Sequence, residues 1–194
     1  MFTQMKGRTY RMTRRAETRD ATRDRIVAAA VALHEELGPR ATTVSAIAER
    51  AGVQRLTVYR HFPDDEAMFA ACSSAWAERH PLPDIADVAG SGRQACRAGL
   101  ARLYGYYREN AGMLASVTRD AAVTPALAAP LAQGAAEIAV YLEGLIARLS
   151  PPLSRAAFAR ATLVHAVRFE TWQSLEAGGL DDDAKADLVM AWLD

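Results

Sequence analysis

Residues 54 to 61, which read QRLTVYRH, concentrate side chains that suit hydrogen bonding to another molecule. On a helix that turns about 100° per residue, placing Val58 inward makes Leu56 and Arg60 point outward. Thr57 and Tyr59 then lie on the two flanks. Arginine can bind guanine through two hydrogen bonds, leucine can contact the thymine methyl group, and hydroxyl groups suit phosphate oxygens. This face suits the major groove of DNA, although a surface helix of an ordinary helical bundle has a similar pattern.

No group of side chains has the spacing that is typical of a catalytic or metal-binding site. HExxH, GxSxG and phosphate-loop motifs are absent, and the 4 histidines and 2 cysteines are scattered. Three consecutive acids, Asp181-Asp182-Asp183, follow Gly178-Gly179 and precede an expected helix, so they are interpreted as its N-terminal cap. The sequence therefore predicts no enzyme, no metal site and no cofactor.

Two short helices are expected to position the DNA-binding face. In TTVSAIAERAGV, residues 42–53, Thr43 can cap a helix whose apolar residues recur at i, i+3, i+4 and i+7. Gly52 follows where a left-handed residue commonly ends a helix. The second helix is expected from about Gln54 to Phe62. Two short helices joined at a glycine turn are typical of a helix-turn-helix.

The rest of the chain also has helical periodicity, without the persistent alternation of strands. One apolar face runs from about Asp20 to Leu37 and ends at Gly38-Pro39. Another helix is expected from about Asp65 to Arg79. Five more are expected at about 93–109, 111–120, 125–149, 154–177 and 182–193, with breaks at proline, glycine and asparagine positions. The predicted fold is all-α, with roughly nine helices.

The charges are distributed unevenly along the 194 residues. Residues 1–61 hold 12 Lys and Arg against 6 Asp and Glu, whereas the remainder holds 11 against 17. A basic first third is typical of a module that meets a polyanion. No stretch is apolar enough to span a membrane or to direct secretion, so a cytoplasmic protein with reduced Cys72 and Cys96 is expected.

The stretch from about Arg23 to Phe69 resembles the DNA-binding end of the TetR family of bacterial transcriptional regulators. The matching parts are an amphipathic helix, Gly38, TTVSAIAERAGV, TVYRHF and then Phe69. The resemblance implies an N-terminal three-helix DNA-binding domain and a C-terminal helical domain for effector binding and dimerisation. We expect a mobile basic arm at 1–19, the DNA-binding domain at 20–66 and the effector-binding and dimerisation domain at 67–194.

The resemblance also implies roles for individual residues. The positions that match DNA-contacting residues of the family are Thr43, Gln54, Arg55, Leu56, Thr57, Tyr59, Arg60 and His61. The hydroxyl residues and His61 match positions that grip the DNA backbone. Arg55, Leu56 and Arg60 match variable positions that set base preference, and Gln54 adds to them from the helix start. Asp65 departs from the family pattern, which often has lysine there, and this departure removes one expected phosphate contact.

Aromatic and apolar residues of the body are candidates for an effector pocket like that of the family. They are Trp76, Tyr104, Tyr107, Met113, Tyr141, His165 and Phe169. A cavity lined by them would suit an apolar or aromatic small molecule. Aromatic residues at helical spacing more often form a simple core, and a core position is the favoured interpretation of His165.

The last two expected helices carry apolar residues that suit either a homodimer interface or the core of one subunit. They are Phe158, Leu163, Val167, Trp172, Leu188, Val189 and Trp192. A dimer is favoured because one helix-turn-helix reads few base pairs, and two-fold proteins match palindromic sites.

The predicted function is a ligand-responsive regulator, a repressor, that binds a palindromic DNA operator as a homodimer and is released by a small-molecule effector. The alternative is a helical small-molecule-binding protein that has lost DNA binding. Retention of Arg55, Thr57, Tyr59, Arg60 and His61 favours the regulator, because a module that no longer binds DNA would be expected to lose this set.

Overall fold

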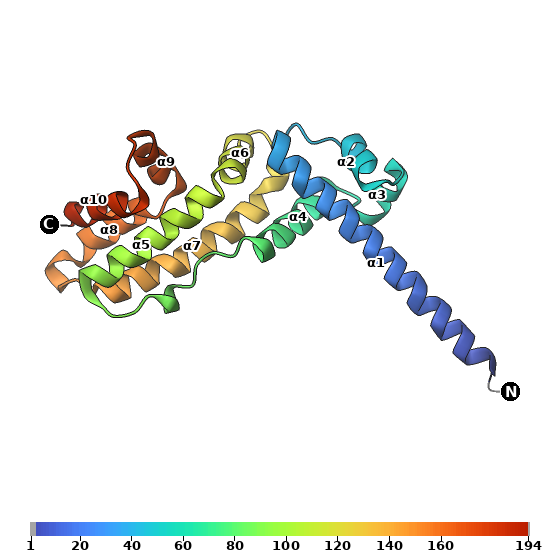
Figure 1. Cartoon of the computed structure of the whole chain (residues 1–194), viewed down its shortest axis with the longest axis horizontal. Coiled ribbons are helices and arrows are strands. Elements are labelled where there is room, and N and C mark those ends of the chain that lie inside the picture. The colour runs from blue at the N-terminus through green and yellow to red at the C-terminus, as the bar shows by residue number, and fades with distance from the viewer. Residues whose placement is uncertain (1–2, 194) are drawn as a thin grey trace. The chain divides into compact units, whose positions relative to one another are not determined.

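The computed structural model describes the backbone of residues 3–193 and the side chains of residues 17–193. This part of the chain contains ten α-helices, three short 3-10 helices and no β-strand (Figure 1). The all-α prediction is confirmed, with ten α-helices rather than nine. None of the described helices is both long and apolar enough to cross a membrane.

The chain forms two compact units. The first comprises the residues up to Arg79 together with Ser116–Ala129, and the second comprises His80–Ala115 and the residues from Pro130 onward. The first unit thus extends past residue 66, where the sequence suggests a boundary, because the whole of the following helix packs within it.

The first unit is built around its N-terminal helix. Its elements are α1 (Thr3–Leu37), α2 (Val44–Ala51), α3 (Arg55–His61), α4 (Asp65–Arg79), the second half of α6 (Ala111–Ala121) and the 3-10 helix η2 (Pro125–Leu127). Ile26 and Ala30 of α1 are fully buried, and α1 packs against both α2 and α4. On α4, Met68, Phe69 and Cys72 are buried at the spacing of one helical face.

Helix α1 begins much earlier than its apolar pattern predicts. The pattern starts near Asp20, whereas the helix starts at Thr3, so the described backbone of residues 3–19 is helical, and the mobility of the arm stays a prediction. The intervening residues include no proline and only one glycine, Gly7. A helix can extend through such residues by backbone hydrogen bonding without an apolar face to bury. The basic side chains at positions 6 to 15 lie outside the described side chains.

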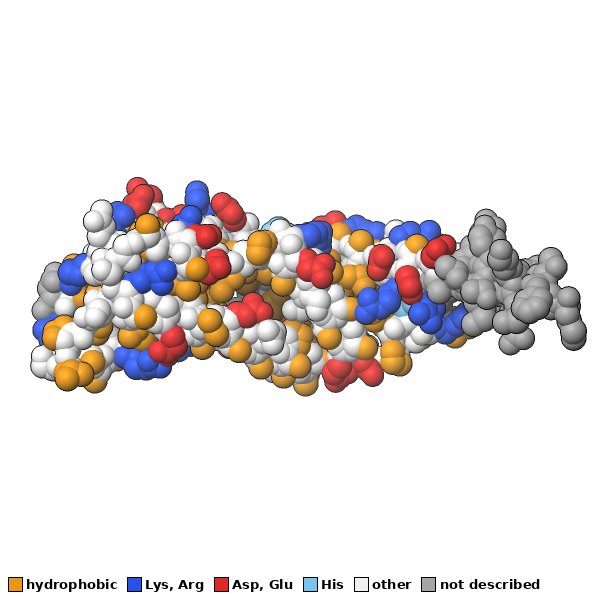
Figure 2. Space-filling model, turned by 90° about the horizontal axis from the view of Figure 1, so that it is seen from below, with side chains coloured by type: hydrophobic (Ala, Val, Ile, Leu, Met, Phe, Trp, Pro, Cys, Tyr) orange, Lys and Arg blue, Asp and Glu red, His pale blue; other side chains and the backbone are white. Residues whose placement is uncertain are grey.

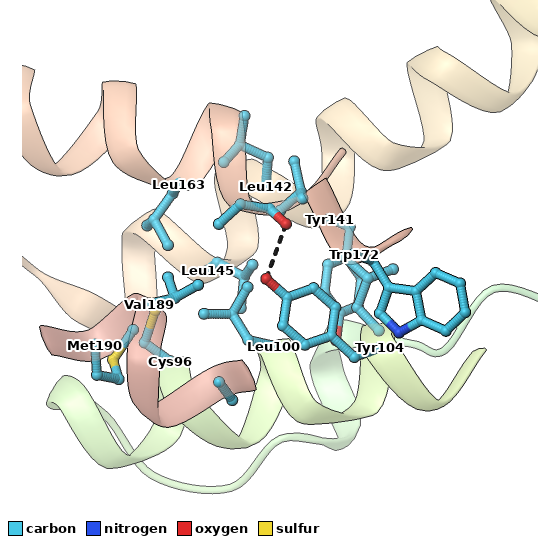
Figure 3. Close-up of a cluster of buried hydrophobic side chains, with 14 of the residues drawn as sticks. Cys96, Leu100, Tyr104, Tyr141, Leu142, Leu145, Leu163, Trp172, Val189 and Met190 are labelled. Atoms are coloured by element: carbon cyan, nitrogen blue, oxygen red, sulfur yellow. Dashed lines mark hydrogen bonds between the residues drawn. The ribbon is translucent and has the colours of Figure 1, made fainter. Parts of the chain in front are cut away.

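The second unit is a helical bundle. Its elements are η1 (Ile85–Asp87), α5 (Gly92–Glu109), the first half of α6, α7 (Ala128–Leu149) from Pro130 onward, η3 (Leu153–Arg155), α8 (Ala156–Ala166), α9 (Phe169–Ala177) and α10 (Asp182–Trp192). Leu100, Leu145 and Val189 are fully buried and point toward one another in its core (Figure 3). Helices α5 and α7 approach closely at Gly99, where a Cβ atom would lie 2.5 Å from Leu145 Cδ2.

The helix expected at 154–177 is interrupted, because α8 ends at Ala166 and α9 begins at Phe169. Two buried tyrosines of α5 stabilise the interruption. The Tyr104 hydroxyl donates to the Ala166 carbonyl at 3.0 Å, and the Tyr107 hydroxyl donates to the Val167 carbonyl at 2.5 Å. Side-chain donors thus satisfy carbonyls at the break that would otherwise be buried without partners. Similarly, the helix expected from 125 begins as 3-10 helix at Pro125–Leu127, before α7.

Candidate nucleic-acid interface

Helix α2 begins with the cap that the sequence predicts. Thr43 has an extended backbone, and its side-chain oxygen accepts a hydrogen bond from the Ala46 N–H at 3.2 Å. The Thr43 side chain is exposed, so its hydroxyl hydrogen stays available to an external acceptor. At the other end, Gly52 adopts φ 64°, and the chain turns directly into α3. The two short helices therefore form the expected helix-turn-helix.

Helix α3 presents the predicted outer face. Val58 is 1% exposed and Phe62 is 3% exposed, so the inner edge packs into the first unit. On the opposite side, Leu56 is 67% exposed and Tyr59 is 46% exposed, although both are large apolar or aromatic residues. A monomeric domain gains nothing from displaying such residues, whereas a groove of DNA would cover them.

The remaining predicted contact residues surround this face. Gln54 is the N-cap residue of α3 but makes no side-chain capping bond, so its amide is not used by the helix. Arg55 and Arg60 are exposed, whereas Thr57 and His61 are half-buried on the flank of the helix. The structure thus brings all eight predicted DNA-contacting residues onto α2 and α3 of one unit.

Contacts from α1 hold the end of α3 and the helix α4 in place. The Arg23 guanidinium lies over the ring of Phe62, 5.0 Å from the ring centroid, where α3 ends. His34 packs beside Phe69 with ring centroids 5.2 Å apart, and its burial lowers the pKa of the imidazole to about 4. His34 is therefore neutral at physiological pH and acts as a core residue.

The turn between α1 and α2 is fixed by an acid from α6. The Asp120 carboxylate, only 4% exposed, accepts the Arg119 Nε–H at 2.9 Å and the Arg40 backbone N–H at 3.0 Å. These two hydrogen bonds hold the pKa of Asp120 below its ordinary value. Gly38 lies beside them with φ +86°, and a Cβ there would be 3.0 Å from Asp120 Oδ2. Nothing in the sequence around Asp120 indicates this role, because the contact joins residues 80 positions apart.

The acids that follow α3 have separable roles. Asp64 caps α4, because its side chain accepts the Ala67 N–H at 2.8 Å. Asp65 is exposed in the first turn of α4, where a negative charge stabilises the helix dipole. The loss of a phosphate contact at Asp65 stays a prediction.

One feature of the first unit was not predicted from the sequence. A cavity of about 310 Å³ lies between α1 and α3, and its lining residues are Thr18, Arg19, Thr22, Thr57, Arg60 and His61. The three residues from α1 have no distinctive motif, so only the packing of the two helices reveals them.

Comparison with known proteins decides the family of one segment of the chain. Residues 26–72 match the family model for bacterial regulatory proteins of the tetR family. This segment is therefore a TetR-family DNA-binding segment. The matched segment includes the helix-turn-helix, the last third of α1 and the first half of α4. The helix-turn-helix of this chain is accordingly of the type found in bacterial regulatory proteins of the tetR family. No curated protein matches the sequence.

Solved structures share the fold over most of the length of this chain. A TetR-like transcriptional regulator from Rhodococcus sp. RHA1 is 19% identical with a TM-score of 0.61, covering 89% of this chain and 93% of its own. A second transcriptional regulator from the same organism is 23% identical with a TM-score of 0.58, covering 88% and 93%. RolR in complex with resorcinol is 20% identical with a TM-score of 0.51, covering 92% and 88%.

The candidate effector residues occupy different environments. Tyr104, Tyr107 and Tyr141 are buried in the second unit with their hydroxyls bonded to backbone carbonyls, the last to Gly99 at 2.8 Å. Met113 and Phe169 are half-buried in the same unit, whereas Trp76 is half-buried in the first unit. A cavity of about 590 Å³ lies along the start of α5, and none of the seven candidates lines it.

His165 is exposed, which contradicts the expectation of a core histidine. It lies at the end of α8, and its ring is 6.2 Å from that of Trp192. The break after α8 places this residue at a helix end, so the periodicity of an uninterrupted helix does not apply to it.

Most of the expected dimer residues are buried within one subunit. Leu163 and Val189 are fully buried, and Val167 and Trp172 are each 3% exposed. Phe158 alone among the seven is strongly exposed, at 51%, whereas Leu188 and Trp192 are half-buried. The short helices α9 and α10 fold back on α5, so their apolar faces complete the core of the second unit.

The acidic run at the start of α10 is structural in this unit. The Asp181 side chain caps α10 by accepting the Ala184 N–H at 2.7 Å. Asp182 pairs with Arg108 at 2.8 Å and with the buried Lys185 at 3.3 Å. Asp183 pairs with Arg97 at 3.0 Å. Among the described residues, no group of three or more His, Cys, Asp or Glu side chains could hold a metal ion.

Proposed function

We propose that this chain represses transcription by binding a palindromic DNA operator as a homodimer, with α3 of each subunit in the major groove. The observation that carries the proposal is the outer face of α3, where Leu56 and Tyr59 are exposed between Arg55 and Arg60. Apolar contact with a thymine methyl and bidentate arginine contacts to guanine are the recognised ways to read base edges. Thr43, Thr57 and His61 lie beside this face, where hydroxyl and ring N–H groups suit phosphates.

A homodimer is supported by exposed apolar residues on two neighbouring helices of the second unit. Val140 of α7 is 70% exposed, and Phe158 and Val164 of α8 are 51% and 44% exposed. Arg160 of α8 donates to Glu143 of α7 at 3.0 Å, so the two helices lie side by side. We therefore assign the dimer interface to α7 and α8, which keeps the first part of the expected helix 154–177 and replaces the expected helix 182–193. Two such helices from each subunit would form a four-helix bundle.

An aromatic or apolar effector is supported by the aromatic cluster of the second unit. Phe169 stacks on Trp172 with centroids 5.5 Å apart, and Tyr107 meets Phe169 edge-on at 5.5 Å. Phe169 and Met113 are half-buried and reachable by a ligand. RolR, similar in fold, is complexed with the aromatic compound resorcinol. An effector that releases DNA must bind more weakly to the DNA-bound protein, by the same factor by which it weakens DNA binding.

The test is selection of bound duplexes from a random DNA pool, repeated with two leucine variants. Wild-type protein should enrich a two-fold symmetric sequence, and Leu56→Ala should change the preferred base at one position of each half-site. Leu37→Ala is the control, because Leu37 is a 50% exposed leucine of the same unit that lies outside α3. Enrichment of the same sequence by all three proteins would contradict the placement of α3, and no enrichment by the wild type would contradict DNA recognition itself.

A further inference from the structure

The cavity between α1 and α3 is formed by one face of each helix. Thr57, Arg60 and His61 recur at i, i+3 and i+4 on α3, so they share a face. Thr18 and Thr22 are four residues apart on α1, with Arg19 next to Thr18. All six residues belong to the first unit, and Arg23 on Phe62 fixes α1 against the end of α3 one turn from the cavity.

The lining of this cavity is positively charged. Arg19 and Arg60 contribute two guanidinium groups, and none of the described residues that line the cavity is acidic. Within the described residues, Arg60 forms no ion pair. Arg19 contacts Asp20 at 3.3 Å, but both side chains are more than 60% exposed, so water screens this pair. The site therefore attracts an anion.

Hydrogen-bond donors are also available in the cavity. The Thr22 hydroxyl is committed to the Thr18 carbonyl at 2.8 Å, so Thr22 shapes the wall. The Thr57 hydroxyl and the His61 ring lie on the opposite wall and are half-buried. Arginine, threonine and histidine supply the donors that a tetrahedral oxyanion accepts from, and the open volume of about 310 Å³ leaves room for one phosphate group of a larger molecule. On the face drawn in Figure 2, several blue Lys and Arg side chains gather beside a pale blue histidine.

We propose that this cavity holds one phosphate group of the DNA backbone, so that α1 binds DNA together with α3. The inference rests on the proposed function and adds a contact from outside the helix-turn-helix. Arg19 reaches the phosphate from α1, and Thr57 and His61 reach it from α3. Arg19 precedes the residues that match the family model, which begin at 26, so the family match does not assign this role.

The position of the cavity determines how a bound phosphate would act on the orientation of α3. It lies on the flank of α3, beside the outward face that carries Leu56 and Arg60. A phosphate held there fixes the depth and rotation of α3 in the groove without reading any base. Arg60 borders both the cavity and the outer face. Its positive charge therefore attracts the phosphate even when its guanidinium group binds a base.

The experiment measures binding of the full-length protein to a labelled 30-bp duplex of random sequence by fluorescence anisotropy, from low to high salt. Each phosphate contact contributes about 0.9 to the slope of log affinity against log salt concentration. Arg19→Ala should therefore reduce this slope by about 0.9 per subunit. Arg19→Lys should keep the wild-type slope, because lysine also neutralises a phosphate.

The matched control is Arg25→Ala. Arg25 is an exposed arginine of the same helix, about 240° around the axis from Arg19 and outside the cavity. Its removal changes the net charge equally but should leave the slope unchanged. Equal slopes for wild type and Arg19→Ala, or equal losses for Arg19→Ala and Arg25→Ala, would overturn the phosphate site alone. A wild-type protein that binds no duplex would overturn the proposed function, and this site with it.

Discussion

Arg60 and Tyr59 are neighbours on α3 with different expected roles at the DNA. Tyr59→Ala should weaken binding to every sequence, because a hydroxyl that binds phosphate carries no base information. Arg60→Ala should lose about 1–3 kcal/mol of discrimination at one base pair, as expected for an arginine that reads guanine. Competition titrations with duplexes altered at single positions measure both effects. A loss of affinity for Arg60→Ala that is the same for all duplexes would contradict base reading by this residue.

His34 links the stability of the first unit to pH. Its pKa is about 4 in the folded protein and 6.5 as its ordinary value, so the unfolded chain binds more protons between these values. Stability is therefore highest above pH 6.5 and falls as the pH decreases toward 4. From pH 7 to pH 5 the loss should be about 2 kcal/mol. Urea unfolding at both pH values measures it, and His34→Gln should remove most of the difference. An equal loss in the variant would show that other groups cause it.

Glycine substitutions test whether Asp120 stabilises the turn between α1 and α2. Gly38→Ala should destabilise the protein by about 2 kcal/mol or more, because a left-handed backbone is strained for alanine and the new Cβ would lie 2.5 Å from Arg119 Nη2 and 3.0 Å from Asp120 Oδ2, which disturbs the Arg119–Asp120 pair. Gly52→Ala is the matched comparison: its φ is +64°, but nothing lies within 4 Å of the added Cβ. That change should cost only about 1 kcal/mol. Urea unfolding of both variants should rank them in this order, and the reverse order would contradict the role of Asp120.

Elements with a strong local signal could be predicted from the sequence. Thr43, Gly52 and the burial of Val58 and Phe62 follow from capping, turn and periodicity rules, and the structure confirms them. The start of α1 could not be predicted, because it depends on backbone propagation in residues without an apolar face. The break after Ala166 could not either, because hydroxyls of Tyr104 and Tyr107 stabilise it from another helix.

At the scale of the whole molecule, burial depends on packing that sequence periodicity cannot specify. Leu163 and Val189 have the spacing of an interface, but α9 and α10 fold back and enclose such residues in one subunit. The cavity between α1 and α3 is a second example, since Arg19 and His61 line it together although they are 42 residues apart in the sequence. The sequence therefore predicted the helix-turn-helix better than the surfaces that surround it.

The assembly of two subunits is tested by charge placed on the proposed interface. Val164→Glu should shift the protein from dimer to monomer, because a carboxylate would be buried opposite its own copy near the two-fold axis. Val123→Glu is the control, since Val123 is 59% exposed and lies in the first unit. Sedimentation velocity distinguishes the two species. A dimer that survives Val164→Glu would place the interface elsewhere.

The central claim, that the chain recognises a specific DNA sequence, is tested most directly by one ratio of affinities. The dissociation constant of the wild-type protein is measured for the duplex selected from the random pool and for a shuffled duplex of the same composition, at the same salt concentration. The account predicts a two-fold symmetric selected sequence that binds at least about 1,000-fold more tightly. Equal dissociation constants for the two duplexes would contradict it.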